Sequence, residues 1–334
     1  MFLNFNNYLL SSFYGVKILL TIFHIKSLLS RLIYFNFKAF VPINCITEKK
    51  NSKLFFIIGS GRSGNTILRA MLSVHERIVI PPEFYNLKKL ILTLLKNRHL
   101  CWDNLCVIAA NIFFTTADHE AWGINKNEMI TELKNYDKID QNISNLILSF
   151  HKYYSRGFTD KKDIIIGDKS PLNSFSVFLI NEIYPAAKYI HTYRDGRDVV
   201  LSYKKAKIYE TFVGAAHRWN NSISMILKFE KKINDNSKIY SYSYENFVLK
   251  NVKTVKKICN FLEIDFDERL LTNYQNQFNK LGDTVKHIHH KNVKKRIFAS
   301  SINNWKSLHS SEQKEFSTIM PIIKKNLKKL NYEI

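Results

Sequence analysis

Cysteine is scarce in this sequence, and its four cysteines form no recognisable motif. Cys45, Cys101, Cys106 and Cys259 include no C-x-x-C pair and no zinc spacing, and no H-E-x-x-H sequence occurs. A disulfide scaffold and a zinc site are therefore not predicted. The pattern favours free, mostly buried thiols in a reducing compartment, and we expect no metal.

Glycine and proline are also infrequent, with 10 and 6 among 334 residues, whereas hydrophobic residues make up 46%. This composition excludes fibrous chains and largely disordered ones. No internal repeat or low-complexity tract occurs along the chain. The length suffices for one large α/β domain with a substantial core.

Acidic residues are few beside the basic ones, and the formal net charge is +22. An excess of this size is typical of proteins that bind nucleic acid, an anionic membrane surface or a polyanionic ligand. A composition rich in Lys, Asn and Ile would produce the same excess without any function. Because no basic stripe alternates with stacking aromatic residues, nucleic acid is the least favoured partner, and we expect none.

Long uninterrupted hydrophobic runs are missing as well, although the first fifty residues are apolar and aromatic. Asparagine and charged residues interrupt them, so no window of ~18 apolar residues predicts a membrane-spanning helix. The start also lacks the basic region and cleavage site of a signal peptide. Lys17, Lys26, Arg31 and Lys38 among Leu, Ile and Phe predict amphipathic helices.

These helices either lie on a membrane surface, through residues 1–45, or pack against the rest of the protein. We therefore divide the chain into a hydrophobic N-terminal extension, residues 1–50, and one domain, residues 51–334. The expected location is cytoplasmic, with membrane association if the extension binds lipid. A signal-anchored membrane protein is the alternative.

Apolar runs of strand length alternate with helical patterns along residues 51–334. Predicted strands are Leu54–Ile58, Ile78–Ile80, Ile164–Ile166, Tyr189–Tyr193 and Ile239–Ser243. Predicted helices begin at Asn65, fill most of 84–158, and recur at 171–184, from 196, and at 212–232, 246–262, 266–278 and 311–330. This alternation predicts a P-loop-like doubly wound parallel sheet flanked by helices, with ligands at the carboxyl ends of the strands.

The first strand, a glycine-rich turn and an amphipathic helix follow one another in LFFIIGSGRSGNTILRAML, residues 54–72. Such a turn binds anions, because its backbone N–H groups and those of the first helical turn are unpaired. Gly59, Gly64 and Thr66 have the spacing of a Walker A loop. However, Asn65 occupies the lysine position, and the nearest cation is Arg62. We expect a nucleotide-like anion to bind here without ordinary triphosphate chemistry.

This segment resembles the 5′-phosphosulfate loop of sulfotransferases that use 3′-phosphoadenosine 5′-phosphosulfate (PAPS). A second segment, KYIHTYRDGRDVVLSYKK from residue 188, resembles the family's 3′-phosphate segment. A third, IYSYSYENFVLKNVKTVKKICNFLEI from residue 239, resembles its strand and Y-E-D-L helix. Bacterial sulfotransferases with a P-P-E segment and tyrosylprotein sulfotransferases are the most similar groups. The resemblance covers roughly residues 53–334.

The resemblance implies a donor site at two of these segments. The 5′-phosphosulfate is expected to be enclosed by Arg62, Ser63, Gly64, Asn65 and Thr66. Arg194 and Ser202 are eight residues apart, at a strand end and on the first turns of the following helix, so a guanidinium fork and a hydroxyl can meet on one phosphate. In the family this is the 3′-phosphate. Tyr244 is expected beside the donor, and Asp195 and Asp198 read as a solvated charge run that caps a helix.

Three residues are candidates for the chemistry. Glu83, after Pro81-Pro82, matches the glutamate that acts as base in tyrosylprotein sulfotransferases; a helix N-terminal carboxylate is the alternative. Lys169 matches a family K-x-P segment and would reach the bridging oxygen or sulfonate, unless it is a surface lysine. Arg62 supplies the loop cation. Asp168 resembles a Walker B aspartate without its lysine partner.

A C-terminal basic residue closes over the donor in the family, before a tryptophan. Here Asn304 precedes Trp305, so the charge would come from Lys294, Lys295, Arg296 or Lys306. Trp219 is expected to pack in the core between helices.

The sequence therefore predicts a metal-independent, PAPS-dependent sulfotransferase that binds PAPS and its product, 3′-phosphoadenosine 5′-phosphate (PAP). The acceptor, a glycan, a tyrosine or a small molecule, is expected between residues 84–158 and 206–214. Two alternatives stay open: a P-loop nucleotide kinase or hydrolase, and a non-catalytic protein that binds polyanions or membranes.

Overall fold

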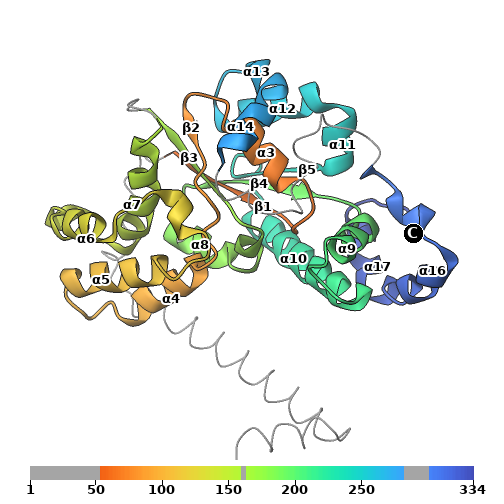
Figure 1. Cartoon of the computed structure of the whole chain (residues 1–334), viewed down its shortest axis with the longest axis horizontal. Helices are drawn as coiled ribbons and strands as arrows, with labels where there is room; N and C mark the ends of the chain where they lie inside the picture. The colour runs from red at the N-terminus through yellow and green to blue at the C-terminus, as the bar shows by residue number, and fades with distance from the viewer. Residues whose placement is uncertain (1–52, 159–162, 282–300) are drawn as a thin grey trace, which may run out of the picture. The chain divides into compact units, whose positions relative to one another are not determined.

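The structure, a computed structural model, describes residues 53–158, 163–281 and 301–334 (Figure 1). The predicted extension at residues 1–50 and the membrane contact at 1–45 lie outside the described residues. None of the described helices is both long and apolar enough to cross a membrane.

The centre of the fold is a parallel sheet of five strands in the order β2-β3-β1-β4-β5. The strands are β1 (Leu54–Ile58), β2 (Ile78–Val79), β3 (Ile165–Lys169), β4 (Lys188–Tyr193) and β5 (Ile239–Ser243). The central strand β1 is an entirely apolar and buried run, LFFII, because its neighbours β3 and β4 cover both edges and helices cover both faces. The five predicted strands are confirmed, with small changes in their bounds.

Helices lie on both faces of the sheet, as Figure 1 shows, so the predicted doubly wound architecture is confirmed. On one face, Phe55 and Ile57 of β1 pack with apolar residues of α3 (Asn65–Leu72) and α12 (Asn251–Leu262). On the other, Phe229 of α10 (Phe212–Ile233) meets Tyr189, which stacks on Phe56. The layers hold the carboxyl ends of β1, β3 and β4 at one edge.

A helical insertion separates β2 from β3. It contains α4 (Leu87–Lys96), α5 (Trp102–Phe113), η2 (His119–Trp122), α6 (Lys126–Lys134), η3 (Lys138–Asp140) and α7 (Ile143–Arg156). An aromatic cluster of Phe84, Phe113, Trp122 and Phe150 joins these helices. The mainly helical pattern predicted for residues 84–158 is confirmed.

Four helices predicted as continuous are each divided. Residues 171–184 form η4 (Pro171–Phe175) and α8 (Val177–Ile183). Residues 246–262 are divided at Lys250, between α11 (Tyr244–Leu249) and α12. Residues 266–278 form α13 (Arg269–Thr272) and α14 (Tyr274–Lys280). Residues 311–330 form α16 (Ser310–Ser317) and α17 (Met320–Lys329), because Pro321 lacks an N–H and fits only a first helical turn.

Two further details agree with the sequence. Trp219 of α10 is fully buried and packs against Gly196, where α9 (Gly196–Lys205) begins, as expected of a core residue. Of the described cysteines, Cys101 is exposed while Cys106 and Cys259 are buried, and burial raises their pKa to about 12 and about 11. Cys45 lies outside the described residues.

Candidate functional site

The loop between β1 and α3 has the geometry of an anion cradle. Gly64 adopts a left-handed backbone, with φ of 94°, and a Cβ there would lie 2.7 Å from the ring of Tyr244. Only glycine fits such a position without strain. No side chain caps the N-terminus of α3, so the N–H groups of its first turn are available to an anion.

Asn65 closes this loop upon itself. Its Nδ2 donates a hydrogen bond to the main-chain oxygen of Ser60 over 3.2 Å, where a nucleoside triphosphatase would extend a lysine. Asn65 was expected to help enclose the 5′-phosphosulfate, but its side-chain amide binds the loop's own backbone instead. Among the described residues, the buried Ser63 Oγ and Asn65 Oδ1 have no hydrogen-bond partner. An orphaned hydroxyl inside the loop fits a ligand rich in oxygen atoms.

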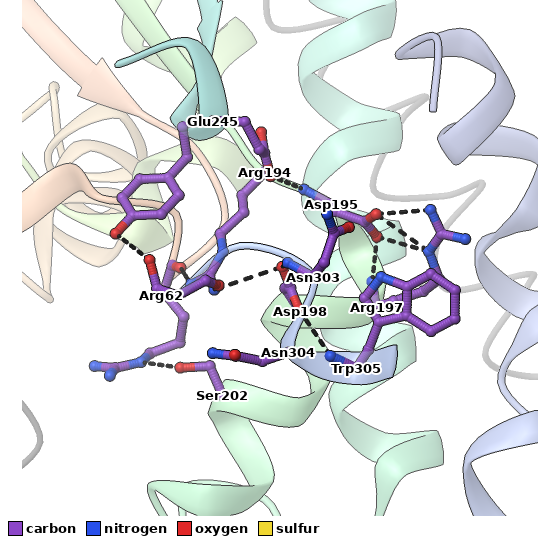
Figure 2. A network of polar contacts seen from close by, with 12 residues as sticks. Arg62, Arg194, Asp195, Arg197, Asp198, Ser202, Glu245, Asn303, Asn304 and Trp305 are labelled. Atoms are coloured by element: carbon purple, nitrogen blue, oxygen red, sulfur yellow. Dashed lines mark hydrogen bonds and ion pairs between the residues drawn. The ribbon is translucent and has the colours of Figure 1, made fainter. Parts of the chain in front are cut away.

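Arg62, Ser202 and Arg194 converge beside this loop (Figure 2). Arg62 Nε donates to Ser202 Oγ of α9 over 3.1 Å, and Arg194 Nη1 donates to the main-chain oxygen of Arg62 over 3.1 Å. The two predicted phosphate segments therefore form one site. One detail differs from expectation, because Ser202 pairs with Arg62 while Arg194 bonds main-chain oxygens.

The electrostatics of this site favour an anion. Burial and, second, the positive charge of Arg194 lower the pKa of the Arg62 guanidinium. Two guanidinium groups held this closely repel each other, and a bound anion would relieve that repulsion. The residues present therefore fit an anionic ligand.

Tyr244 and the C-terminal chain complete this side of the site. The Arg194 guanidinium lies over the Tyr244 ring, 4.7 Å from its centroid, and Tyr244 Oη and Ser301 Oγ are 3.0 Å apart. The sequence did not identify Ser301. Of the basic residues considered for closing the site, Lys294, Lys295 and Arg296 lie outside the described residues, and Lys306 is exposed, over the Trp305 ring.

The reading of Asp195 and Asp198 as a solvated charge run is wrong. Both side chains are buried, at 4% and 1% exposure. Asp195 does cap α9, accepting from the N–H of Arg197 over 2.9 Å. Asp198 instead accepts hydrogen bonds from the N–H groups of Asn303 and Trp305, which only the tertiary fold brings near.

Glu83 and Lys169 form an ion pair at the carboxyl end of β3. Lys169 is 1% exposed and Glu83 9%, so the surface-lysine alternative is wrong. The pair unites the two residues that the sequence proposed for proton and charge handling. Removing either member of a buried ion pair would leave the other charge without compensation.

A second buried network is centred on Asp168, the residue before Lys169 in β3. The carboxylate of Asp168 is 2.8 Å from His151 Nε2 of α7 and accepts from Asn173 Nδ2 over 2.6 Å. The neighbouring Ser174 hydroxyl bonds both the N–H and the carbonyl oxygen of Gly59, at 3.1 and 3.0 Å. The network thus ties β3 to the beginning of the phosphate loop. Sequence reasoning saw Asp168 only as a Walker B candidate and missed His151.

A surface hollow of about 650 Å³ lies in the helical insertion, within the region predicted to contact the acceptor. Its lining includes Trp122, Tyr154 and Phe158 together with the carboxylates of Glu128 and Glu132. Trp122 also meets the ring of His151 edge-on, with centroids 5.3 Å apart. No group of three or more His, Cys, Asp or Glu side chains in the described part of the chain could hold a metal ion.

Comparison with known proteins identifies the family. A model of the sulfotransferase family matches residues 55–268. This chain belongs to the sulfotransferase family. It is 25% identical over 232 residues to protein-tyrosine sulfotransferase A of Caenorhabditis elegans, an alignment covering 68% of this chain and 54% of that protein. An uncharacterized protein of Aquifex aeolicus (strain VF5) is 24% identical over 292 residues, 82% of this chain and 33% of that protein. This sulfotransferase-family chain thus spans about half the length of one relative and a third of the other.

Two solved sulfotransferase structures share the fold. The sulfotransferase domain of the Synechococcus PCC 7002 olefin synthase has a TM-score of 0.57 at 22% identity, covering 86% of this chain and 98% of that domain. The sulfotransferase domain from the curacin biosynthetic pathway has a TM-score of 0.54 at 20% identity, covering 86% and 100%. These likenesses confirm the predicted P-loop-like α/β fold of the sulfotransferase family.

Proposed function

We propose that this protein transfers a sulfuryl group from PAPS to an acceptor hydroxyl, or amine, by in-line displacement. The observation that carries the proposal is the convergence of Arg62, Ser202 and Arg194 beside an uncapped helix N-terminus. PAPS is anionic at both ends, and this site offers a cationic group for each phosphate.

The loop would hold the 5′-phosphosulfate. Arg62 supplies a positive charge there, and Ser63, Gly64, Asn65 and Thr66 supply main-chain N–H groups and the orphaned Ser63 hydroxyl. Arg194 and Ser202 would bind the 3′-phosphate, with the Tyr244 ring beneath the Arg194 guanidinium.

Sulfuryl transfer breaks the bond from sulfur to the bridging oxygen and forms one to the acceptor oxygen, whose proton must leave. Glu83 would accept that proton, because its buried carboxylate, paired with Lys169, lies at the carboxyl end of β3, where the donor is proposed to bind. The Lys169 ammonium and Arg62 guanidinium would then offset negative charge that develops on the bridging oxygen. Donors placed where charge develops are each typically worth about 3–4 kcal/mol.

The acceptor is proposed to approach from the helical insertion. The hollow beside Trp122 has aromatic faces, together with carboxylates that already bond Tyr153 and Arg156, and this mixed lining suits an acceptor with a ring and several hydroxyl groups, such as a glycan. A tyrosine or a small molecule is the other proposal. Assaying transfer from PAPS to glycans, tyrosine peptides and phenols would separate these classes.

The deciding experiment is calorimetric titration with PAP, ADP and ATP in the absence of divalent metal. Binding of PAP alone supports the proposal. Tighter binding of ATP, with dependence on magnesium, would instead support a kinase or hydrolase, which the bond between Asn65 and Ser60 disfavours.

Association of residues 1–45 with a membrane surface is a separate proposal, supported by their apolar, lysine-containing sequence. Sedimentation with anionic vesicles would test it, comparing the full chain with one that begins after residue 50. Equal sedimentation of both would contradict it.

A further inference from the structure

The four charged side chains of the R-D-G-R-D segment, residues 194–198, all contribute to holding one stretch of C-terminal chain, residues 301–305 (Figure 2). Asp198 accepts hydrogen bonds from the N–H groups of Asn303, at 2.8 Å, and Trp305, at 3.1 Å. Asn303 has a left-handed backbone, with φ of 61°, which turns the chain around the carboxylate. A buried carboxylate that accepts two main-chain N–H groups makes strong, charge-assisted bonds.

Arg197 and Asp195 hold the tryptophan of this stretch. Both carboxylate oxygens of Asp195 bond the Arg197 guanidinium, at 2.7 to 3.1 Å. That guanidinium lies over the Trp305 ring, 4.1 Å from its centroid. The carboxylate thus fixes the plane of a cation that stacks on the indole.

Arg194 is shared between this stretch and the donor site. Its Nη2 donates to the main-chain oxygen of Ser301 over 2.5 Å, while its Nη1 donates to that of Arg62. A guanidinium has five N–H donors, and the Nε of Arg194 has no hydrogen-bond partner among the described residues. Arg194 can therefore donate a hydrogen bond to a phosphate while it keeps its bonds to both carbonyl oxygens.

We propose that Asp198 and Trp305 are positioning residues for the 3′-phosphate of the donor. By docking residues 301–305 they hold Arg194 in the orientation that binds this phosphate. An arginine that is already oriented loses less side-chain freedom on binding, so its affinity for the phosphate is higher. Coupling of this kind is reciprocal, so the bound phosphate stabilises the docked stretch in turn. The inference rests on the proposed use of PAPS.

The first test measures nucleotide binding by calorimetry in the Asp198→Asn and Trp305→Ala variants. We expect the affinity for PAP to fall about tenfold in each variant. The affinity for ADP should change less than about twofold, because ADP has no 3′-phosphate. Glu230→Gln is the matched control, since Glu230 is a largely buried carboxylate bonded to His191, outside the site. Unchanged PAP affinity in both site variants, or equal losses for PAP and ADP, would overturn the inference.

Trp305 is only partly buried, so its replacement keeps the test available if Asp198→Asn does not fold. A second measurement needs no nucleotide: hydrogen exchange at the amides of Asn303 and Trp305. We expect slow exchange in the wild type, faster exchange in Asp198→Asn, and further slowing by PAP. Wild-type exchange as fast as at an exposed loop would refute the docking itself. If exchange is slow but PAP does not bind, the proposed donor is wrong, and the role toward its phosphate falls with it.

Discussion

The guanidinium of Arg194 donates a hydrogen bond to the main-chain oxygen of Arg62, across 132 positions of sequence. This bond joins the segment after β4 to the phosphate loop after β1. Since β1 and β4 are parallel neighbours, their carboxyl ends meet at one edge of the sheet. Arg62 extends the connection to Ser202 on α9, so one ligand can touch all three residues.

Replacing Arg194 by alanine should remove recognition of the 3′-phosphate. Charge-assisted hydrogen bonds are worth about 1.5–3 kcal/mol, so we expect affinity for PAP to fall about 10- to 100-fold. Affinity for adenosine 5′-phosphosulfate, which lacks that phosphate, should change little. Calorimetry with both ligands measures the difference. Arg269→Ala is the control, because Arg269 pairs with Asp267 at an exposed position. Equal losses for the two nucleotides would remove the role assigned to Arg194.

The Glu83–Lys169 pair predicts separate effects on activity and stability. Glu83→Gln should lower kcat about 10²- to 10⁴-fold, the usual contribution of a positioned base, with PAP affinity nearly unchanged. Lys169→Met should destabilise the fold by about 3–5 kcal/mol, because it leaves a buried carboxylate without its ammonium. Steady-state kinetics and urea unfolding provide the two measurements.

The double variant Glu83→Gln with Lys169→Met would separate the effect of the pair on stability from its effect on activity. Removing both charges should restore most of the lost stability but none of the activity. Recovered activity in the double variant would mean that the pair stabilises the fold and has no part in catalysis.

Asp168 should act as a positioning residue for Lys169. Asp168→Asn weakens the bond to His151 behind β3, and we expect kcat to fall about tenfold with little change in PAP affinity. His191→Gln is the matched comparison, since His191 is a buried histidine 2.8 Å from the Glu230 carboxylate. That variant should lose stability and keep its kcat. The idea fails if the two variants show the same kinetic profile.

Burial makes the stability contribution of Asp198 depend on pH. Burial chiefly raises the pKa of Asp198 above its ordinary value of 3.8, so the folded state binds this proton more tightly than the unfolded state. The contribution of Asp198 to the free energy of unfolding therefore falls as the pH rises from its ordinary pKa to the raised pKa of the folded state. It returns as the pH is lowered. Relative to Asp198→Asn, the wild type should gain stability as the pH is lowered from neutral toward the ordinary pKa of 3.8. Urea unfolding across this range would show it, and a constant difference would contradict the shift.

The sheet and the phosphate loop could be predicted because local sequence determines them. LFFII is buried on both faces, which leaves a continuous apolar run, and the loop after it needs glycine at a left-handed position such as Gly64. Helix breaks were harder to predict. The break at Lys250 lies inside a continuous amphipathic pattern, where only the backbone angles, φ −134° and ψ 48°, reveal it.

Partnerships between distant residues could not be predicted from the sequence. Glu83 and Lys169 were each proposed for the chemistry, but 86 positions separate them, and only the packing of the insertion on β3 pairs them. Asp198 was misread because a local charge run resembles a solvated helix cap. Its actual partners lie more than a hundred positions away, in residues 303 and 305.

The central place of β1 has a consequence for how the chain acquires its structure. Leu54 pairs with Ile166, and Phe55 with Lys188, so β1, which is synthesised before β3 and β4, must wait for both of its neighbours. Loop-closure entropy makes such distant pairing slow. Before β3 and β4 have been synthesised, both edges of the apolar LFFII strand lack these partners, and exposed apolar strands of this kind are prone to aggregate.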